Sequence, residues 1–549
     1  MRRALIFILG TALLAAGCGE GDKRTDVRDA VPASSRYGGT AVVAALMEAN
    51  SMNHLASVDD ISNELQNFVL FTTLIRYDAD LLPVPYLAQS WDTIVSGDEM
   101  VLTFQLRDDV AWHDGAPTTA RDVKFTFDRI KDPATAYPRV SSFALYDSAV
   151  VQDTYTIAFY LKRHPGFMDP WRTVSPMPAH ILGDIPADQL RAHPFGTSTP
   201  LGNGPFRFVE HRASDRWVFE ANPDFPESLG GRPYLDRLVY RFIEEPTTRL
   251  AELLTGEVDV YLIVAPSQVA EIEASSEVGI VTYANRNYAF INWNGRHPFF
   301  ADPNVRRALT LAVDRQEILD VVRQGFGQVA KGPVPPFHWA YDKDLEPLPY
   351  DPERARGILD AAGWIDRDGD GVREHDGIRA SFDLKTNPNP TREDIMTLVQ
   401  ANLAQVGVEV RPRVQEAQSL GRDITSPERL FDAFVLGWRA EFNLDARPLF
   451  ACSALEGPYQ WASYCNPRVD EILDRVMLMP DRSQALPLWH EYQEVMQRDQ
   501  PNTFLYYDMR INASREKLRG VEMDIRGDLI SAKDWWIAPA DRRQIGDPN

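Results

Sequence analysis

Apolar residues recur along the chain alternately with the period of a strand and the period of a helix. Residues 101–106 carry an apolar residue at every second position, which predicts a strand with one buried face. Residues 238–243 predict another strand, residues 246–255 a helix that begins at a proline and ends before a glycine, and residues 258–262 a further strand. A strand, a helix and a strand in succession imply parallel pairing through a crossover connection.

The same unit recurs far downstream. Residues 382–384 predict a strand, residues 395–406 a helix with one apolar face, and residues 408–410 the next strand. Three further helices are predicted between the two units, each beginning at an aspartate that can cap it: Asp302, Asp314 and Asp351. Asp314 and Glu317 also have the spacing of a capping box. Two such units more than 100 residues apart predict an α/β protein with two separate lobes.

The first 36 residues have the pattern of an export signal followed by a tether. Two arginines precede an apolar run at residues 4–16, which is too short to span a bilayer and is typical of a signal peptide over residues 1–17. The run ends in small residues before Cys18 and resembles a bacterial lipobox, so we expect lipid on the Cys18 sulfur. The alternative is an ordinary signal peptide with an incidental cysteine. Residues 18–36 are polar and predict a flexible tether.

Length and charge narrow the class of protein. A chain of 549 residues suggests three or four domain-sized units, and no stretch after the signal approaches the 18 apolar residues of a membrane span. The net charge of −22 argues against a nucleic-acid partner, because binding phosphates needs a basic surface. We therefore expect an exported, monomeric protein that is anchored to a membrane through its lipid.

Two cysteines remain after Cys18. Cys452 and Cys465 lie 13 positions apart, and a disulfide between them is plausible in an oxidising compartment. A loop of that size would contribute about 3 kcal/mol to stability in the chain-entropy description. The alternative is two separate buried thiols.

Eight short segments have a recognisable sequence and order. They are residues 87–91 with 103–130, then 202–206 (with Asn203 where threonine is usual), 230–245, 254–260, 302–319, 361–377, 463–473 and 505–507. Together they resemble the family 5 solute-binding proteins of peptide-type ABC importers. The resemblance extends from about Tyr37 to about Met523.

The resemblance implies an α/β, two-lobed, periplasmic-binding-protein-like (type II) fold. Lobe I would comprise residues 37–285 with an extra subdomain at about 72–200, lobe II residues 286–507, and residues 508–549 would return to lobe I. A small ligand, which we expect to be a short peptide, would bind between the lobes and be delivered to ABC permease subunits. Oligosaccharides, opines and nickel chelates are the alternative ligands, and fold alone does not separate them.

The resemblance also implies ligand-binding residues. Glu441 occupies the place of the family's amine-binding aspartate, and its alternative is a solvated loop residue. Trp438 would offer an aromatic wall, or pack in the core. The strand with Phe290 and Asn292 could pair with an extended ligand, although Asn292 could instead bond within the lobe. Asp59 matches a loop that lines the family's cleft, and could equally be a surface carboxylate.

The sequence contains few signs of a catalytic site. The sequence has no GxSxG, HExxH, GxxxxGK[ST] or GxGxxG motif, and the ten histidines are scattered without ligand spacing. Residues 366–371 resemble the first half of a calcium loop, but Gly377 stands where the bidentate glutamate belongs, so a hydrogen-bonded turn is favoured. We expect no enzyme activity and no cofactor; an exported hydrolase with cleft carboxylates is the remote alternative.

Overall fold

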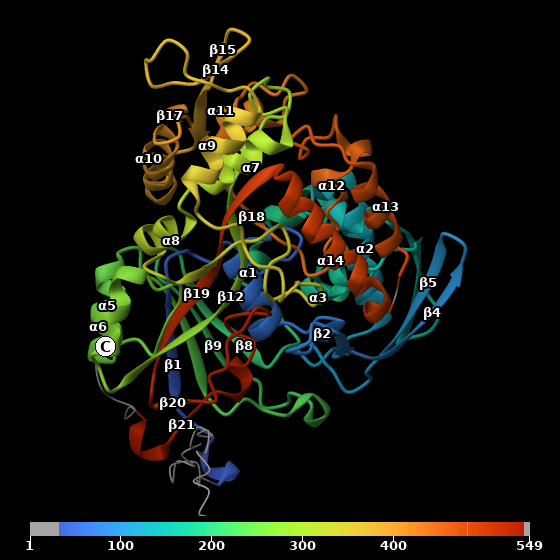
Figure 1. The fold of residues 1–549 in the computed structure, drawn as a ribbon. Helices are drawn as coiled ribbons and strands as arrows, with labels where there is room; N and C mark the ends of the chain where they lie inside the picture. Colours follow the sequence, from blue (N-terminus) through green and yellow to red (C-terminus); the bar gives the residue numbers. More distant parts are fainter. Residues whose placement is uncertain (1–31, 480, 543–549) are drawn as a thin grey trace, which may run out of the picture.

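The computed structural model describes residues 32–479 and 481–542, so Cys18 and the signal peptide lie outside the described residues. Figure 1 shows two lobes joined by long strands, with a third group of elements beside them. The described residues include no helix long and apolar enough to cross a membrane.

One mixed sheet of eleven strands runs through both lobes. Its lobe I strands are β1 (Thr40–Ala45), β8 (Phe206–Arg212), β9 (Arg216–Ala221), β10 (Arg237–Phe242) and β11 (Val260–Tyr261). Its lobe II strands are β13 (Gly327–Val329), β16 (Ser381–Thr386), β17 (Glu409–Val414) and β18 (Ala433–Arg439). The antiparallel strands β12 (Val278–Trp293) and β19 (Asn502–Arg515) belong to both lobes, and their register shifts between Ala284 and Tyr288.

Both predicted strand-helix-strand units are confirmed. In lobe I, α5 (Pro246–Thr255) connects β10 to β11, and β1 lies between these strands, parallel to each. In lobe II, α10 (Pro390–Ala404) connects β16 to β17, which pair directly in parallel. β11 is shorter than predicted, because only Val260 and Tyr261 pair with neighbouring strands.

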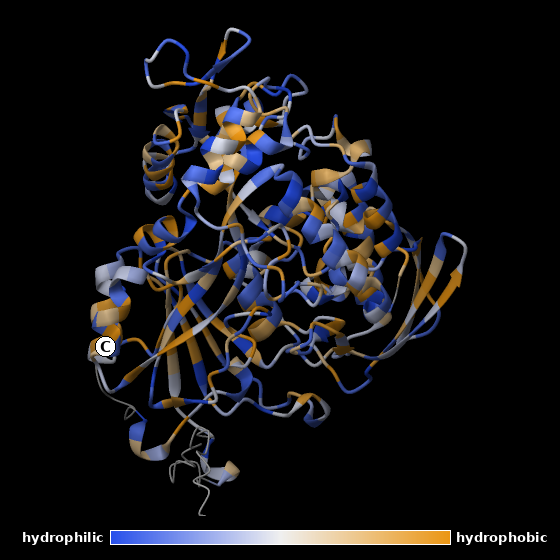
Figure 2. Ribbon diagram, in the orientation of Figure 1, coloured by the Kyte–Doolittle hydropathy of each residue, from blue (hydrophilic) through white to orange (hydrophobic). Residues whose placement is uncertain are grey.

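A separate antiparallel sheet forms the extra part of lobe I. Its order is β4 (Ala88–Ser96), β5 (Glu99–Leu106), β7 (Thr156–Lys162) and β6 (Tyr146–Val151), and α2 (Ala120–Lys131) contacts β6 and β7. β5 contains the first predicted strand, and its alternate residues Met100, Leu102, Phe104 and Leu106 are buried. Figure 2 shows the resulting alternation of apolar and polar residues along the β4–β5 hairpin.

The lobe II sheet is covered on both faces. Alternate residues of β12 belong to different cores: Ile291 packs in one hydrophobic cluster, Tyr288 and Phe290 in another. The first core is covered by α7 (Pro303–Ala312), α8 (Arg315–Arg323), α9 (Pro352–Ala361) and α10, the second by α11 (Ala417–Thr425), α13 (Pro467–Val476) and α14 (Arg482–Asp499).

The three predicted capping aspartates cap α7, α8 and α9. At α8 the Asp314 carboxylate accepts from the Glu317 backbone N–H at 2.9 Å. The reciprocal half of the predicted capping box does not form, because the Asp314 N–H donates to Asn402 Oδ1 on α10 at 2.8 Å. A tertiary contact therefore replaces a local one.

Candidate functional site

A cavity of about 740 Å³ lies between the lobes. Lobe I lines it with α1 (Asp60–Leu65), β2 (Ile75–Tyr77), α3 (Asp169–Thr173) and residues 525–530. Lobe II lines it with residues that end β18 and follow it, from Trp438 to Leu449, and with Tyr459. This volume is in the range that small-molecule and short peptide ligands occupy.

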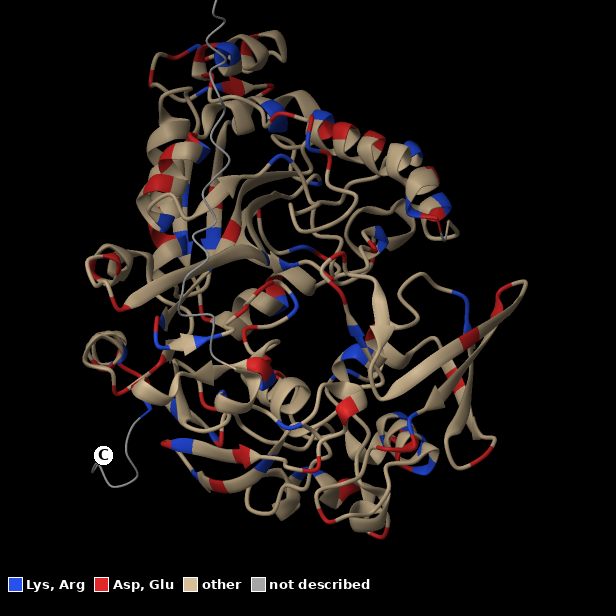
Figure 3. Cartoon of the chain, turned by 90° about the horizontal axis from the view of Figure 1, so that it is seen from below, with Lys and Arg blue, Asp and Glu red and all other residues tan. Residues whose placement is uncertain are grey.

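The cavity is rich in charge of both signs. Seven arginines line it, namely Arg76, Arg139, Arg172, Arg286, Arg439, Arg510 and Arg526. Six acidic residues line it as well: Asp60, Glu64, Asp169, Glu441, Asp445 and Asp528. Positive and negative charges in the cleft are therefore nearly equal in number, although the whole chain has a net charge of −22. Figure 3 shows basic positions on segments around the middle of the molecule.

Glu441 reaches the cavity from the loop after β18. Its side chain is 73% exposed, and Oε2 accepts a hydrogen bond from Arg286 Nη2 at 2.6 Å. Arg286 is buried on β12 and also donates from Nε to the Ala440 carbonyl at 2.7 Å. Burial lowers the pKa of Arg286 to about 10, partly offset by Glu441, so the guanidinium remains charged at neutral pH. A fixed cation thus holds an accessible carboxylate in the cleft.

The ring of Phe442 supports this corner of the cleft. The guanidinium carbons of Arg172 and Arg286 lie 4.3 and 4.5 Å from its centroid. Tyr77 and Phe337 meet the same ring edge to face, with centroids 6.0 and 5.8 Å away. Two cations therefore share one aromatic ring, an arrangement in which each gains cation–π attraction while repelling the other.

Trp438 lines the cavity and packs within lobe II at the same time. Its half-buried indole lies 6.0 Å from the Tyr459 ring and 5.6 Å from the Trp461 ring, in both cases edge to face. The two alternatives for Trp438 are therefore compatible, since one side of the ring is packed and another borders the cleft.

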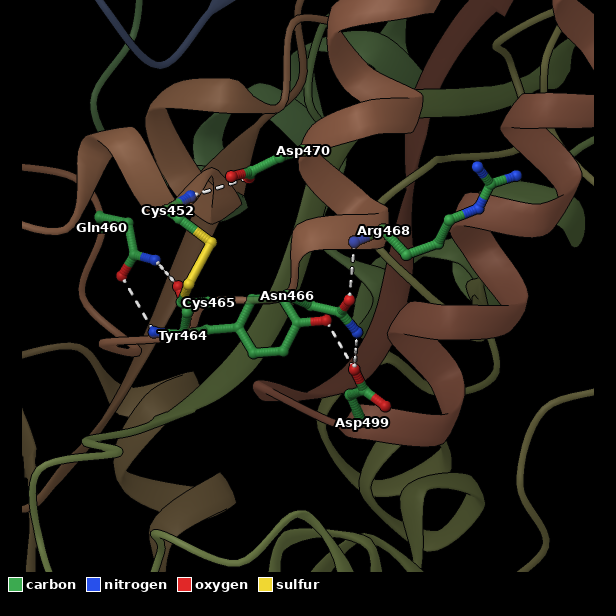
Figure 4. Close-up of a disulfide and its surroundings, with 8 residues drawn as sticks. All are labelled: Cys452, Gln460, Tyr464, Cys465, Asn466, Arg468, Asp470 and Asp499. Carbon is green, nitrogen blue, oxygen red and sulfur yellow. Dashed lines mark hydrogen bonds between the residues drawn. A yellow bond between two sulfur atoms is a disulfide. The ribbon is translucent and has the colours of Figure 1, made fainter.

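Cys452 and Cys465 form a disulfide, with their Cα atoms 4.6 Å apart (Figure 4). The Cys452 N–H donates to Asp470 Oδ1 at 2.8 Å, and Asp499 accepts from Tyr464 and Asn466, both at 2.7 Å. The loop that the disulfide closes contains Tyr459 and Trp461. It therefore constrains the segment that supports Trp438.

Two residues predicted to bind an extended ligand do not reach the cleft. Phe290 and Asn292 are each 1% exposed, and neither borders the large cavity. The proposed pairing with a ligand strand is wrong, because β12 already pairs with β18 on one edge and with β19 on the other. The sequence showed a strand there but not its neighbours.

Asp59 has a structural role, and its neighbour takes the place predicted for it. Asp59 caps α1 by accepting from the Ser62 N–H at 2.8 Å, and it does not border the cavity. Asp60 borders the cavity and forms an ion pair with Arg439 of lobe II. Burial favours a higher pKa for Asp60, but Arg439, Arg139 and Arg510 together outweigh this effect and the pKa is lowered overall.

Glu64 and Asp528 form an acidic pair on the lobe I wall that was not among the predicted site residues. Asp528 accepts from the Tyr283 hydroxyl at 2.5 Å and from Asn512 at 2.6 Å, and pairs with Arg510 at 3.3 Å. Glu64 accepts from the Leu529 N–H at 3.0 Å, and burial and then Asp528 raise its pKa to about 8. Glu64 and Asp528 are far apart in sequence, so no linear signal could have paired them.

The segment at 366–371 is a hydrogen-bonded turn. The Asp366 carboxylate accepts from the N–H groups of Gly369 and Gly371 at 2.7 and 3.0 Å. Asp370 pairs with Arg379 at 2.6 Å. Carboxylate oxygens of Asp366, Asp368 and Glu374 lie within 4.8 Å of one another, at the surface of lobe II.

Two α/β lobes joined by continuous strands, with a charged, ligand-sized cleft between them, define a binding protein of the periplasmic type II class. The chain matches the family of bacterial extracellular solute-binding proteins, family 5, over residues 83–454, and it belongs to that family. It is 32% identical to the oligopeptide-binding protein AppA of Bacillus subtilis over 92% of each chain, and 27% identical to the dipeptide-binding protein of Escherichia coli over 88% of this chain and 94% of that one.

Solved structures of relatives have the same fold. The structure of Bacillus subtilis AppA in complex with a nonapeptide is 32% identical, with a TM-score of 0.73 over 92% of this chain and all of that one. The structure of NikZ from Campylobacter jejuni in complex with Ni(L-His) is 25% identical, with a TM-score of 0.70 over 90% of this chain and 99% of that one. The family consists of solute-binding proteins rather than enzymes.

Proposed function

We propose that this chain captures a short peptide in the interlobe cleft and delivers it to the permease subunits of an ABC importer. The observation that carries the proposal is the accessible Glu441 carboxylate, fixed by Arg286 beside an aromatic wall in a cavity of about 740 Å³. The relative whose structure was solved in complex with a nonapeptide covers 92% of this chain, and this supports a peptide ligand.

In this proposal Glu441 binds the ammonium group of the peptide. Oε1 of Glu441 has no hydrogen-bond partner among the residues that the structure describes, so one carboxylate oxygen is free to accept. A hydrogen bond between ions is stronger than a neutral one and gains further when the cleft excludes water. Trp438 provides an apolar surface for a nearby side chain.

Ligand capture would involve closure of two lobes, residues 37–285 with 508–549 and residues 286–507, with the extra subdomain at about 72–200. The register shift between Ala284 and Tyr288 offers a natural hinge, because a bulge already interrupts the ladder there. Contacts between the lobes include the ion pair of Asp60 with Arg439 and the hydrogen bond from Asn443 to Asp169 at 2.7 Å.

The protein would work outside the cytoplasm as a monomer, held at a membrane by lipid on Cys18. This part of the proposal rests on the apolar run at residues 4–16 and the small residues that precede Cys18. A catalytic role is not proposed, since members of the family are binding proteins.

Native mass spectrometry of residues 19–549, purified from cells and then denatured, tests the ligand class. Release of a set of short peptides would support the proposal. Release of an oligosaccharide, an opine or a nickel chelate would overturn the peptide assignment and leave the binding-protein fold in place. Peptide hydrolysis during incubation would instead favour an exported hydrolase.

A further inference from the structure

Arg172 differs from the other arginines of the cleft. Four of the other arginines form ion pairs with carboxylates: Arg286 with Glu441, Arg439 with Asp60, Arg510 with Asp528 and Arg526 with Asp524. The remaining two donate to neutral oxygens, Arg76 to the Tyr86 hydroxyl and Arg139 to the Val58 carbonyl. Across residues 32–479 and 481–542, Arg172 has neither a hydrogen-bond acceptor nor a carboxylate within ion-pair distance, and its Nε is buried without a partner.

Two aromatic rings hold the Arg172 guanidinium in place. Its central carbon lies 4.3 Å from the Phe442 centroid and 5.2 Å from the Tyr77 centroid. Rings bind a guanidinium through its flat faces, whereas its N–H donors point outward in its own plane. Stacking therefore orients Arg172 without using its hydrogen-bonding capacity.

The nearest acidic residue on the same helix is already engaged. Asp169 accepts from the Tyr77 hydroxyl with one oxygen and from Asn443 with the other, at 2.7 Å for the latter. Arg172 and Arg286 lie on one ring, and Arg172 contributes to the lowered pKa of Arg286, after burial and Arg439. Positive charge thus accumulates beside Glu441, the carboxylate assigned to the ligand's ammonium.

We propose that Arg172 is a specificity-determining residue that receives a carboxylate of the ligand, close to the ammonium that Glu441 binds. This inference rests on the proposed function, because it assumes a peptide whose amino end lies at Glu441. A carboxylate beside an ammonium is the chemistry of an acidic first residue. The cleft therefore selects peptides that begin with glutamate or aspartate.

Calorimetric measurement of the affinity for three matched sets of peptides tests this selection. Short peptides of mixed length are prepared with glutamate first, with glutamine first, and with glutamate moved to the last position. The glutamate-first set binds at least about tenfold more tightly than the other two, since a charge-assisted bidentate bond replaces a neutral contact.

Variants separate recognition from folding. Arg172→Gln weakens binding of glutamate-first peptides more than binding of glutamine-first peptides, so that the preference is lost. Arg172→Lys retains part of the preference because a point charge replaces the planar fork. Arg121→Gln, at an exposed arginine of α2 in the same subdomain, leaves the preference intact. Thermal unfolding of each variant verifies that it is folded.

The possible results distinguish the two proposals. If the wild type binds all three peptide sets equally, the role of Arg172 is wrong and peptide binding stands. If the preference persists in Arg172→Gln, another cleft arginine supplies it and the assignment is overturned. If no peptide binds to the wild type, the proposed function fails and this inference fails with it.

Discussion

Arg286 and Glu441 form a pair in which the cation is buried and the anion is exposed. Arg286 Nη2 donates to Glu441 Oε2 at 2.6 Å, and the two side chains are 10% and 73% exposed. The arginine is fixed a second time by the Ala440 carbonyl. The carboxylate is consequently held in one orientation while its second oxygen remains accessible, which is the preorganisation that a binding group requires.

Replacing Glu441 should weaken binding of peptides with a free amino end. Glu441→Ala is expected to lower affinity about tenfold to hundredfold, because it removes a charge-assisted hydrogen bond and leaves Arg286 unpaired. N-acetylated peptides should show a much smaller difference in the same calorimetric assay. Glu456→Ala, at a 78% exposed glutamate of the same lobe, serves as the control. Equal affinities in wild type and Glu441→Ala would remove Glu441 from the site.

The ion pair between Asp60 and Arg439 should contribute modestly to closure. Both side chains are more than 40% exposed, so solvent screens the pair and Arg439→Ala should reduce affinity by no more than about fivefold. The difference in affinity between wild type and Arg439→Ala should become smaller at high salt, because salt screens the ion pair. Exchanging the charges, with Asp60→Arg and Arg439→Asp together, should restore binding; failure of the double variant would argue against an interlobe contact.

Glu64 should make stability depend on pH. Its pKa is raised from 4.5 to about 8 in the folded protein, so its contribution to folding is fully present below pH 4.5 and is lost as pH rises through about 8. Glu64→Gln keeps an acceptor for the Leu529 N–H without the charge. The midpoint temperature of thermal unfolding should therefore fall less steeply between pH 5 and pH 8 for Glu64→Gln than for wild type. If the midpoints of the two proteins depend on pH in parallel, the carboxyl is not buried and protonated as described.

The disulfide should stabilise lobe II and support the cleft wall. Cys452→Ser with Cys465→Ser is expected to lower the free energy of unfolding by about 3 kcal/mol, from the size of the closed loop. A reductant should destabilise the wild type by a similar amount and leave the double variant unchanged. Peptide affinity should also fall, because Tyr459 and Trp461 lie in the loop and contact Trp438.

Cys18→Ala should release the protein from the membrane. We expect the wild type in the membrane fraction, labelled by radioactive fatty acid, and the variant unlabelled in the soluble fraction outside the cytoplasm. Membrane association without label in the wild type would favour an ordinary signal peptide and another means of attachment.

Sequence periodicity was sufficient for elements whose signals are local. The helix at residues 246–255 begins at a proline and ends before Gly256, which adopts a positive φ of 89°, and the strands on either side of it were found with it. Only one half of the capping box predicted for α8 forms. The Asp314 N–H donates to Asn402 Oδ1, which is distant in sequence, instead of to Glu317. Local rules fail where a tertiary partner competes for the same group.

The candidate site was predicted less completely than the fold. Glu441 and Trp438 border the cleft, whereas Phe290 and Asn292 are enclosed because the neighbours of a strand are not encoded in the strand itself. The prediction named Asp59, whereas the residue that borders the cleft is its neighbour Asp60. Asp59 instead caps α1, and this local role decides which of the two faces the cleft. Arg172 and Glu64 had no motif to identify them.

The two long strands β12 and β19 connect the lobes as one hydrogen-bonded ladder rather than as two loops. Sliding one lobe along the other would break backbone pairs on both sides of the register shift, whereas bending at the shift leaves both halves of the ladder paired. Opening at this shift is therefore the motion that costs the ladder the fewest backbone pairs. Under the proposed function, a transporter that responds to this angle would receive the same mechanical signal from every solute that closes the cleft, whatever the solute's chemistry.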